Sequence, residues 1–350
     1  MLQQTQVKTA VAYWRRWMQA LPDVRAFARA SPARAHKLWE GLGYYARVRN
    51  ARAAARVMVE KHGGEFPKTF AEALALPGVG RYTAGAVCSI AYNHPAAALD
   101  GNAMRVLSRL FGVAGDPRGK QANRRLWELA EELVAAAASL PSAAPAKSIP
   151  AFPSHAARRK PTGRNCGRFN EALMELGALV CTPKQPRCAA CPLQRNCFAR
   201  REGRQREFPM LKPAGKTTRR RFAAFIVNRN GRFLARRRPP GGVNALLWEF
   251  PNVEIAPEEN YPAAPAAAPF VLKGTKPAWR TRHSITRHRI LLEAYRAELP
   301  GRAGTGAVPG VWRTRAQLER LAFTGAHRKI LAALRDEIKL KERTQAASVG

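Results

Sequence analysis

The sequence contains no run of about 18 or more apolar residues, so it offers no segment suited to spanning a membrane. Its start, MLQQTQVKTAVAYWRRW, lacks the basic region and small-residue cleavage site of a secretory signal. We therefore expect an intracellular protein, cytoplasmic and, in a bacterium, associated with the nucleoid. Acidic residues are also scarce, with 24 Asp and Glu against 60 Lys and Arg and a formal net charge of +36.

Such a charge attracts polyanions, and nucleic acids are the commonest polyanions inside cells. A compositional bias is the alternative, because Arg far outnumbers Lys and Ala is abundant. With 46% hydrophobic residues the chain is too apolar to be a disordered basic tail, and 350 residues favour two domains.

Residues 1 to about 140 show helical spacing of apolar side chains and little strand-like alternation, which predicts an all-α region. Helical spacing returns between Phe169 and Leu179. Between these regions, residues 141–164 combine five prolines with small and basic residues, which is typical of a solvated loop or insertion.

A basic linker over residues 199–221 precedes a change of pattern. The strand-forming runs Phe222–Val227 and Arg232–Arg238 flank an Asn-Arg-Asn-Gly turn, which predicts a hairpin. Residues 283–295 are expected to supply a further strand pair and residues 316–341 a helix. The second half is therefore predicted to mix α and β structure.

Four of the six cysteines fall within 17 residues, at Cys181, Cys188, Cys191 and Cys197. In an intracellular chain this density predicts a metal site rather than disulfides. Zinc sites prefer two closely spaced pairs and only one is present, so the spacing favours an iron–sulfur cluster over zinc. Unliganded structural thiols are the remaining alternative. Cys88 and Cys166 are expected to be packing residues.

The segment Leu76–Ala86 places Gly78, Val79 and Gly80 between two helical runs. Glycines there permit positive φ and let backbone amides face a phosphate at a helix N-terminus, which predicts a helix-hairpin-helix. A plain tight turn between helices needs the same glycines and stays the alternative. Further on, Asp100 precedes another helical run and by itself is typical of a helix N-cap.

The hairpin, the aspartate and the four-cysteine loop together resemble the helix-hairpin-helix DNA glycosylase superfamily, which contains endonuclease III and the adenine DNA glycosylases. Several segments favour the adenine glycosylase (MutY) family. They are Met1–Val7 (MLQQTQV), Gly41–Asn50 (GLGYYARVRN), Leu76–Ala86 (LPGVGRYTAGA), Leu99–Val106 (LDGNAMRV) and Phe169–Cys181 (FNEALMELGALVC). The resemblance runs to about Cys197 and continues more weakly beyond it, with no counterpart for the insertion.

The resemblance implies an all-α helix-hairpin-helix glycosylase domain with a [4Fe-4S] cluster loop over residues 1–198, then the linker 199–221. An α+β Nudix-like domain over residues 222–342 and a tail at 343–350 follow. The implied activity is hydrolysis of the N-glycosidic bond of adenine mispaired with 8-oxoguanine or guanine in double-stranded DNA, by a monomer. The cluster ligands would be the four closely spaced cysteines.

Reaching a base inside a duplex requires flipping its nucleotide out and filling the gap. Gln3, Gln4 and Tyr44 match family residues that insert around the lesion, although spacing alone would equally allow Tyr45. The DNA-binding residues that the resemblance implies are Gln3, Gln4, Thr5, Tyr44, Arg47, Arg49, Gly78, Val79 and Gly80. Together with Arg81 and the basic linkers, these predict a steep salt dependence of binding.

Glycosidic cleavage develops positive charge on the sugar, so a fixed carboxylate stabilises the transition state. By resemblance Asp100 has this role, supported by Asn102 and Tyr82. Bifunctional lyases place a lysine where Tyr82 stands, so a monofunctional enzyme is expected. Glu171 matches a residue that contacts adenine, with a solvated helix carboxylate as the alternative. The runner-up function within the superfamily is an endonuclease III-like lyase. Tyr82 and the long C-terminal half both argue against it.

The family's general-acid glutamate lies two residues upstream of the Met in MLQQTQV, where this sequence begins. Either the start is misassigned or truncated, or the gene is a decayed copy that binds lesions without excising bases. We therefore expect the chain as written to be nearly inactive, and a catalytically impaired lesion-binding protein is the alternative function.

The C-terminal half resembles the Nudix-like domain with which the family reads 8-oxoguanine. After Pro251 it lacks the glutamate-bearing helix of a Nudix hydrolase, so no pyrophosphohydrolase activity is expected. His283 and Thr286 stand in the implied lesion-reading loop, where Arg287 replaces the usual histidine and puts the sharpness of discrimination in question. A solvated strand with incidental histidines is the alternative.

Overall fold

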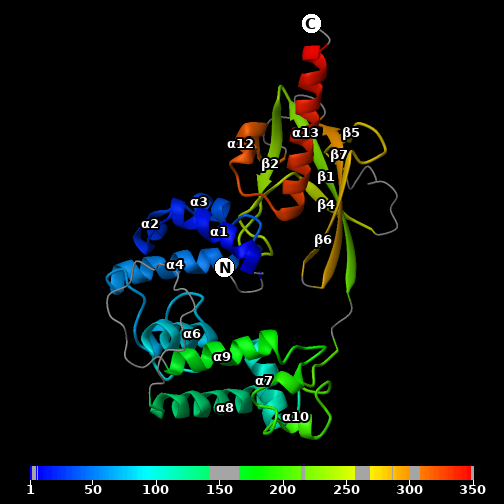
Figure 1. Cartoon of the computed structure of the whole chain (residues 1–350). Coiled ribbons are helices and arrows are strands. Elements are labelled where there is room, and N and C mark those ends of the chain that lie inside the picture. The colour runs from blue at the N-terminus through cyan, green and yellow to red at the C-terminus, as the bar shows by residue number, and fades with distance from the viewer. Residues whose placement is uncertain are drawn as a thin grey trace. The chain divides into compact units, whose positions relative to one another are not determined.

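The computed structural model describes Met1, Thr5 and residues 7–141, 165–213, 217–256, 269–285, 287–299 and 308–347 (Figure 1). One unit of the fold joins Met1–Arg56 to Gly215–Gly350, and the other consists of Val57–Ala214. Within the described ranges every element before Thr218 is helical, which confirms the all-α prediction for that part of the chain. None of these helices is both long and apolar enough to cross a membrane.

The helical unit begins within α4 and ends after the cysteine loop. Its elements are α4 (Ala46–Lys61), α5 (Phe70–Leu74), α6 (Arg81–Tyr92), α7 (Gly101–Phe111), α8 (Lys120–Ser139), α9 (Asn165–Leu179), η1 (Cys188–Ala190) and α10 (Phe198–Arg201). Helix α9 packs against α6, α7 and α8, and the core between them includes Leu107, Leu126 and Leu173. The two remaining cysteines, Cys88 and Cys166, are fully buried in apolar clusters.

Close helix packing explains two features of α7 and α9. Gly112 ends α7 with a φ of +66°, a conformation that glycine adopts without strain. Gly177 brings α9 against α7, because a Cβ there would lie 2.7 Å from the Cβ of Asn102. The glycine therefore positions α9 beside the first turn of α7.

The first helices pack with the C-terminal part of the chain. They are α1 (Val7–Ala20), α2 (Val24–Arg29), α3 (Pro32–Trp39) and the first part of α4. Their buried core, which includes Trp39, Tyr45 and Val48, also contains Leu247 and Ala322. This grouping differs from the expected division near residue 198, because apolar side chains from the first 56 residues find their partners near the C-terminus.

This unit contains an eight-stranded sheet. Its strands are β1 (Thr218–Arg229), β2 (Arg232–Arg237), β3 (Trp248–Glu249), β4 (Asn252–Ile255), β5 (Val271–Leu272), β6 (Trp279–Ile285), β7 (His288–Glu298) and β8 (Val311–Thr314). The central order is β3-β2-β1-β7-β5, while β4 pairs with β1, β6 with β7 and β8 with β2. Strands β1 and β7 are parallel and all other pairs are antiparallel.

The predicted hairpin and strand pair are both present. Asn230 and Gly231 have φ values of +51° and +71° in the turn between β1 and β2, as a primed turn requires. Two helices complete the unit, α12 (Arg315–Glu319) and α13 (Gly325–Ala347). They replace the single helix predicted over residues 316–341, because residues 320–324 between them are not helical. Helix α13 lies over one face of the sheet, as Figure 1 shows, and its residues Ile330 and Leu334 belong to the core on that face. Phe225 and Tyr295 lie in the core of the other face.

Candidate functional site

The hairpin loop joins α5 to α6 with its backbone open to solvent. Gly78 has a φ of +76° and Gly80 is the N-cap of α6, with no side-chain hydrogen bond to the first amides. Gly78 and Gly80 are exposed, and nothing lies within 4 Å of a Cβ placed at Gly80. The first amides of α6 are therefore left accessible to an anion such as a phosphate.

Asp100 caps α7 and holds its carboxylate in a fixed position. Its Oδ1 accepts a 2.7 Å hydrogen bond from the Ala103 amide, and its Oδ2 accepts one of 3.1 Å from Asn102 Nδ2. The cap predicted from sequence is thus present, and it coexists with a half-buried carboxylate. Because the helix dipole favours negative charge at an N-terminus, this position suits an ionised aspartate.

Tyr82, from the first turn of α6, is electrostatically coupled to Asp100. Burial raises the pKa of the Tyr82 phenol and the negative charge of Asp100 raises it further. The phenol is therefore protonated at neutral pH, and its hydroxyl lies 3.7 Å from Met174 Sδ on α9. The structure thus brings together Tyr82, Asp100 and Asn102, the three residues to which the family resemblance assigns catalysis.

Arg105 connects this carboxylate to the cysteine loop, a link that the sequence did not reveal. Its guanidinium donates to Asn102 Oδ1 at 2.9 Å, to the Gly177 carbonyl at 2.7 Å and to the Cys181 carbonyl at 2.8 Å. Asn102 in turn donates to Asp100. A chain of hydrogen bonds therefore runs from Asp100 through Asn102 and Arg105 to Cys181.

Arg109, one turn further along α7, is almost completely buried beside the same loop, with 2% of its surface exposed. It donates to the carbonyls of Thr182, Pro183 and Phe208 at 2.8, 3.0 and 2.9 Å, and its Nη1 lies 3.3 Å from Cys181 Sγ. A buried arginine that binds carbonyls in this way fixes the path of a loop that has almost no regular structure.

Two of the four clustered cysteines lie beside Arg109, because Cys197 Sγ also lies 3.4 Å from the Arg109 carbonyl oxygen. Burial raises the pKa of the Cys191 thiol, and the other three cysteines raise it further, so the four thiols are close enough to interact electrostatically. Among the described residues no three Cys, His, Asp or Glu side chains meet at a single-ion site. An iron–sulfur cluster does not require such a site, because each cysteine binds a different iron.

Glu171 lies exposed on α9. Its neighbour Asn170 is buried and ties α9 to the segment before α7, because it accepts from the Ala98 amide at 3.1 Å and donates to the Ala96 carbonyl at 2.9 Å. Sequence reasoning missed Asn170, although an amide within an apolar helical run is a signal for a buried hydrogen-bonding role.

Tyr44 projects from the turn between α3 and α4, in the other unit. It is 58% exposed and has a φ of +46°, which is uncommon for a residue other than glycine. Arg47 supports the turn by donating to the carbonyls of Leu42 and Gly43 at 3.2 and 3.3 Å, and its guanidinium stacks on the Tyr44 ring. Tyr45, in contrast, is buried, so exposure favours Tyr44 as the inserting residue.

Other residues expected to bind DNA are placed differently. Arg49 is half-buried and its Nη1 lies 3.4 Å from the Ala245 carbonyl oxygen, so part of its donor capacity is used within the protein. Arg81 pairs with Glu131 at 2.5 Å and stacks over Trp127. Thr5 is half-buried, while Gln3 and Gln4 lie outside the described residues.

The expected lesion-reading segment forms the end of the β6–β7 hairpin. His283 is half-buried, and burial together with Lys329 of α13 lowers its pKa, so it lies on the sheet face that α13 covers. Arg287 is exposed in the turn, and Thr286 lies outside the described residues. The insertion at 142–164 also lies outside them.

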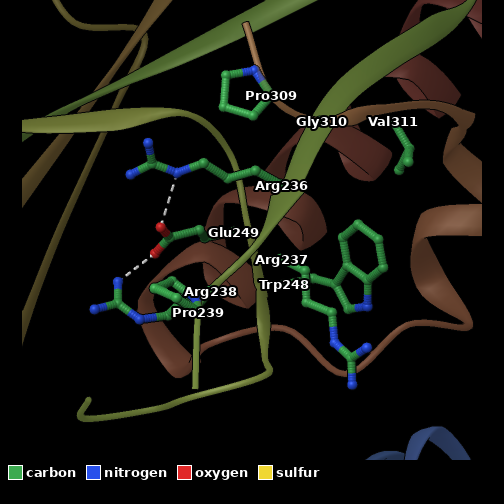
Figure 2. A pocket seen from close by; sticks show the side chains of 9 residues that line it. All are labelled: Arg236, Arg237, Arg238, Pro239, Trp248, Glu249, Pro309, Gly310 and Val311. Atoms are coloured by element: carbon green, nitrogen blue, oxygen red, sulfur yellow. Dashed lines mark hydrogen bonds and ion pairs between the residues drawn. The ribbon is translucent and has the colours of Figure 1, made fainter. Parts of the chain in front are cut away.

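A pocket of about 510 Å³ opens beside β2 in the same unit (Figure 2). Figure 2 shows Arg236 and Arg238 reaching Glu249 from two sides, with nitrogen–oxygen distances of 3.0 and 2.6 Å. Glu249 is only 3% exposed, so both of its oxygens are neutralised inside the protein. The lining residues are Arg236, Arg237, Arg238, Pro239, Trp248, Glu249, Pro309, Gly310 and Val311.

Comparison with known families gives two matches. Residues 1–132 match the HhH-GPD superfamily of base excision DNA repair proteins, and residues 222–333 match the NUDIX domain. Among solved structures, a thermostable thymine-DNA glycosylase is 27% identical and covers 57% of this chain and 80% of its own, with a TM-score of 0.45. A non-covalent endonuclease III–DNA complex is 22% identical with a TM-score of 0.42 and covers 57% of this chain and 79% of its own.

Curated relatives extend over nearly the whole chain. Adenine DNA glycosylase of Mus musculus is 32% identical over 389 residues, covering 96% of this chain and 70% of its own. The Homo sapiens enzyme is 32% identical over 386 residues, covering 94% and 66%. These relatives identify a base-excision repair enzyme that hydrolyses N-glycosyl bonds in DNA. The chain belongs to the adenine DNA glycosylase family.

Proposed function

We propose that the protein excises adenine mispaired with 8-oxoguanine or guanine, as a monofunctional glycosylase acting as a monomer on double-stranded DNA. The observation that carries this proposal is the Asp100 carboxylate, which Ala103 and Asn102 hold at the N-terminus of α7. As the bond between C1′ and N9 breaks, its electrons leave with adenine and positive charge develops on the sugar. A fixed carboxylate stabilises that charge until water adds its oxygen to C1′. The attacking water loses one proton and the departing adenine takes one up, so the products are a sugar hydroxyl and neutral adenine.

The absence of a lyase step rests on Tyr82. Bifunctional enzymes of the superfamily form a Schiff base with a lysine amine at this position, and a protonated phenol cannot do so. Tyr82 instead supplies a neutral hydroxyl beside the carboxylate. Glu171, exposed on α9 in the same unit, is proposed to contact the extruded adenine.

The DNA backbone is proposed to bind at the hairpin loop, where the exposed amides between Gly78 and α6 suit a phosphate. Tyr44, with Gln3, Gln4 and Thr5, would fill the gap left by the flipped nucleotide, and Arg47 would support it. Arg49 would contribute through donors that Ala245 does not use. His283 and Thr286 are proposed to read 8-oxoguanine. His283 would contribute from the sheet face that α13 covers.

The cysteine loop is proposed to hold a [4Fe-4S] cluster through Cys181, Cys188, Cys191 and Cys197. The four interacting thiols and the buried Arg109 beside two of them fit such a group. When bound, the cluster would cross-link a loop with little regular structure. Arg109 would hold the loop in place through hydrogen bonds to the loop carbonyls, and Arg105 would connect the ordered loop to Asn102.

Single-turnover excision on a duplex containing adenine opposite 8-oxoguanine tests the function. We expect slow release of adenine, a still slower reaction opposite guanine, none from an adenine–thymine pair, and no borohydride-trapped complex with DNA. A trapped complex would refute monofunctionality. Tight binding to the lesion without adenine release would instead favour a catalytically impaired lesion-binding protein.

A further inference from the structure

One face of the sheet carries five arginines on three adjacent strands, β1, β7 and β6. We call this set the arginine face, and its members are Arg219, Arg221, Arg280, Arg282 and Arg289. In the parallel β1–β7 pair Arg219 is opposite Arg289, and in the antiparallel β6–β7 pair Arg289 is opposite Ser284. Side chains opposite one another in a sheet share a face, so these three form one row.

Two further rows follow along the same strands. Arg221 and Arg282 flank Leu291, and Ala223 and Arg280 flank Glu293. Neighbouring strands lie about 4.8 Å apart and alternate residues about 6.7 Å apart, so the guanidinium groups can form a compact array. Arg219, Arg280, Arg282 and Arg289 are exposed, which confirms that this part of the face is open to solvent.

Glu293 lies in the third row of the arginine face and, within the described ranges, is the only carboxylate that pairs with these arginines. It is 2% exposed and accepts from Arg280 Nε at 2.8 Å and from Arg221 Nη2 at 2.5 Å. The described residues form no ion pair with Arg219, Arg282 or Arg289. One buried carboxylate therefore faces five guanidinium groups, which leaves a local charge of +4.

Some arginines elsewhere on the sheet or next to it have carboxylate partners: Arg220 pairs with Glu254, Arg296 pairs with Glu337, and Arg236 and Arg238 share Glu249. The arginine face differs from these groups because five arginines lie together on adjacent strands with one carboxylate among them. The patch also has clear limits, because the same face continues into the apolar core around Phe225 and Tyr295, and α13 covers the opposite face.

We propose that the arginine face binds the phosphate backbone of the DNA duplex beside the lesion. Guanidinium groups bind phosphate oxygens in a bidentate manner, and the buried Glu293 fixes Arg221 and Arg280 before DNA arrives. Ser284 adds a hydroxyl donor to the row nearest the β6–β7 turn. The position of the bound segment beside the lesion rests on the proposed function, in which the β6–β7 turn reads 8-oxoguanine. Backbone binding by the arginine face does not depend on that function.

Replacing Arg282 and Arg289 by glutamine tests the proposal. Both are exposed, so we expect unchanged thermal unfolding. The full-length protein is titrated with a duplex of about three helical turns at several salt concentrations, once undamaged and once with 8-oxoguanine opposite an uncleavable adenine analogue. We expect affinity for both duplexes to fall about tenfold at low salt, and the slope of log affinity against log salt to fall by about 2.

The matched control is the double variant Arg232→Gln and Arg313→Gln, which removes the same charge from exposed positions on β2 and β8. We expect its salt slope to equal that of the parent. An unchanged slope in R282Q/R289Q, or an equal drop in the control, would overturn the proposal. Lack of preference for the lesion duplex in the parent would instead contradict the proposed function and leave backbone binding by this face intact.

Discussion

The Glu40 carboxylate accepts a 2.8 Å hydrogen bond from the backbone amide of Phe323, 283 residues further along the chain. Its other oxygen binds Lys37 Nζ at 2.7 Å, and Lys37 also donates to the Leu321 carbonyl at 2.9 Å. Glu40 is 9% exposed, so these bonds form in a nearly dry environment. They tie the end of α3, next to the turn that carries Tyr44, to the loop between α12 and α13.

Replacing Glu40 by alanine should destabilise this unit by about 1–3 kcal/mol, because the buried Phe323 amide loses its acceptor. Lys37 contributes less to the loss, because it is 37% exposed and keeps its hydrogen bond to the Leu321 carbonyl. Chemical denaturation of the variant measures the loss. The control is Glu298→Gln, whose partner Lys273 is exposed, and we expect it to change stability by less than about 1 kcal/mol. Equal effects in the two variants would contradict a special role for Glu40.

Replacing Asp100 by asparagine should abolish catalysis while preserving the fold. Asparagine caps helices as well as aspartate does, but it carries no charge to stabilise the sugar cation. We expect single-turnover excision at least about 100-fold slower than in the parent, with unchanged unfolding. Asp23→Asn is the matched control, because Asp23 caps α2 through an equivalent 2.7 Å bond to Ala26. It should leave excision unchanged.

Arg105→Gln should weaken both excision and retention of the iron–sulfur cluster. The shorter side chain cannot reach Asn102, Gly177 and Cys181 together, so Asp100 and the cysteine loop would lose a shared support. We expect lower iron and sulfide content per chain, weaker visible absorbance and a lower excision rate. Arg124→Gln, at an exposed position of α8, is the control. Full cluster content with normal excision in R105Q would show that this connection is dispensable.

His327 should make stability depend on pH. Burial, opposed by Glu249 and reinforced by Arg236, Arg238 and His283, lowers its pKa from 6.5 to about 4. Between these values the unfolded chain binds the proton and the folded chain does not, so stability is greatest above pH 6.5. It should fall by about 1.4 kcal/mol per pH unit down to pH 4.

Denaturation at several pH values, with the variant His327→Asn, measures this dependence. The asparagine oxygen can replace Nδ1 as acceptor for the Phe250 amide, which His327 binds at 3.2 Å, but it does not titrate. We expect a flatter profile between pH 6.5 and 4 in this variant and the parent profile in His94→Asn, which alters an exposed imidazole. An identical slope in H327N and the parent would refute the assignment.

Tyr44→Gly should separate stability from DNA binding. Glycine relieves the positive φ of this position, while removing the ring loses its stacking with Arg47, so stability should change by less than about 1 kcal/mol. Affinity for a lesion duplex should fall about tenfold or more, because an inserted aromatic ring stacks on bases. Competition binding measures it, with Tyr92→Ala as a control at another exposed tyrosine. Unchanged lesion affinity would exclude insertion by Tyr44.

Local patterns predicted the elements of the fold well. Apolar spacing located α9, and strand-forming runs around an Asn-Gly turn located β1 and β2. The parallel pairing of β1 with β7 was not predicted, nor was the packing of Leu247 against the first helices. Both depend on contacts between distant segments, and such contacts produce no periodic pattern in the sequence of either segment.

For the site, the motif around Asp100 predicted a helix cap and a carboxylate at the same position, and the structure contains both. Tyr44 and Tyr45 were distinguished only by their exposure in the structure. Arg105 and Arg109 were missed, because a single arginine within a helix looks like a solvated side chain when the chain carries 60 Lys and Arg. Only the geometry shows that these two guanidinium groups turn inward to backbone carbonyls.

The packing of Leu247 and Ala322 into the core of the first 56 residues has a consequence for biosynthesis. A ribosome makes the N-terminal helices first, yet their apolar surface stays incomplete until almost the whole chain has emerged. The intervening helical unit, Val57–Ala214, has its own core and can close before then. We therefore expect the middle of the chain to fold first and the N-terminal helices to be the segment most dependent on chaperones during translation.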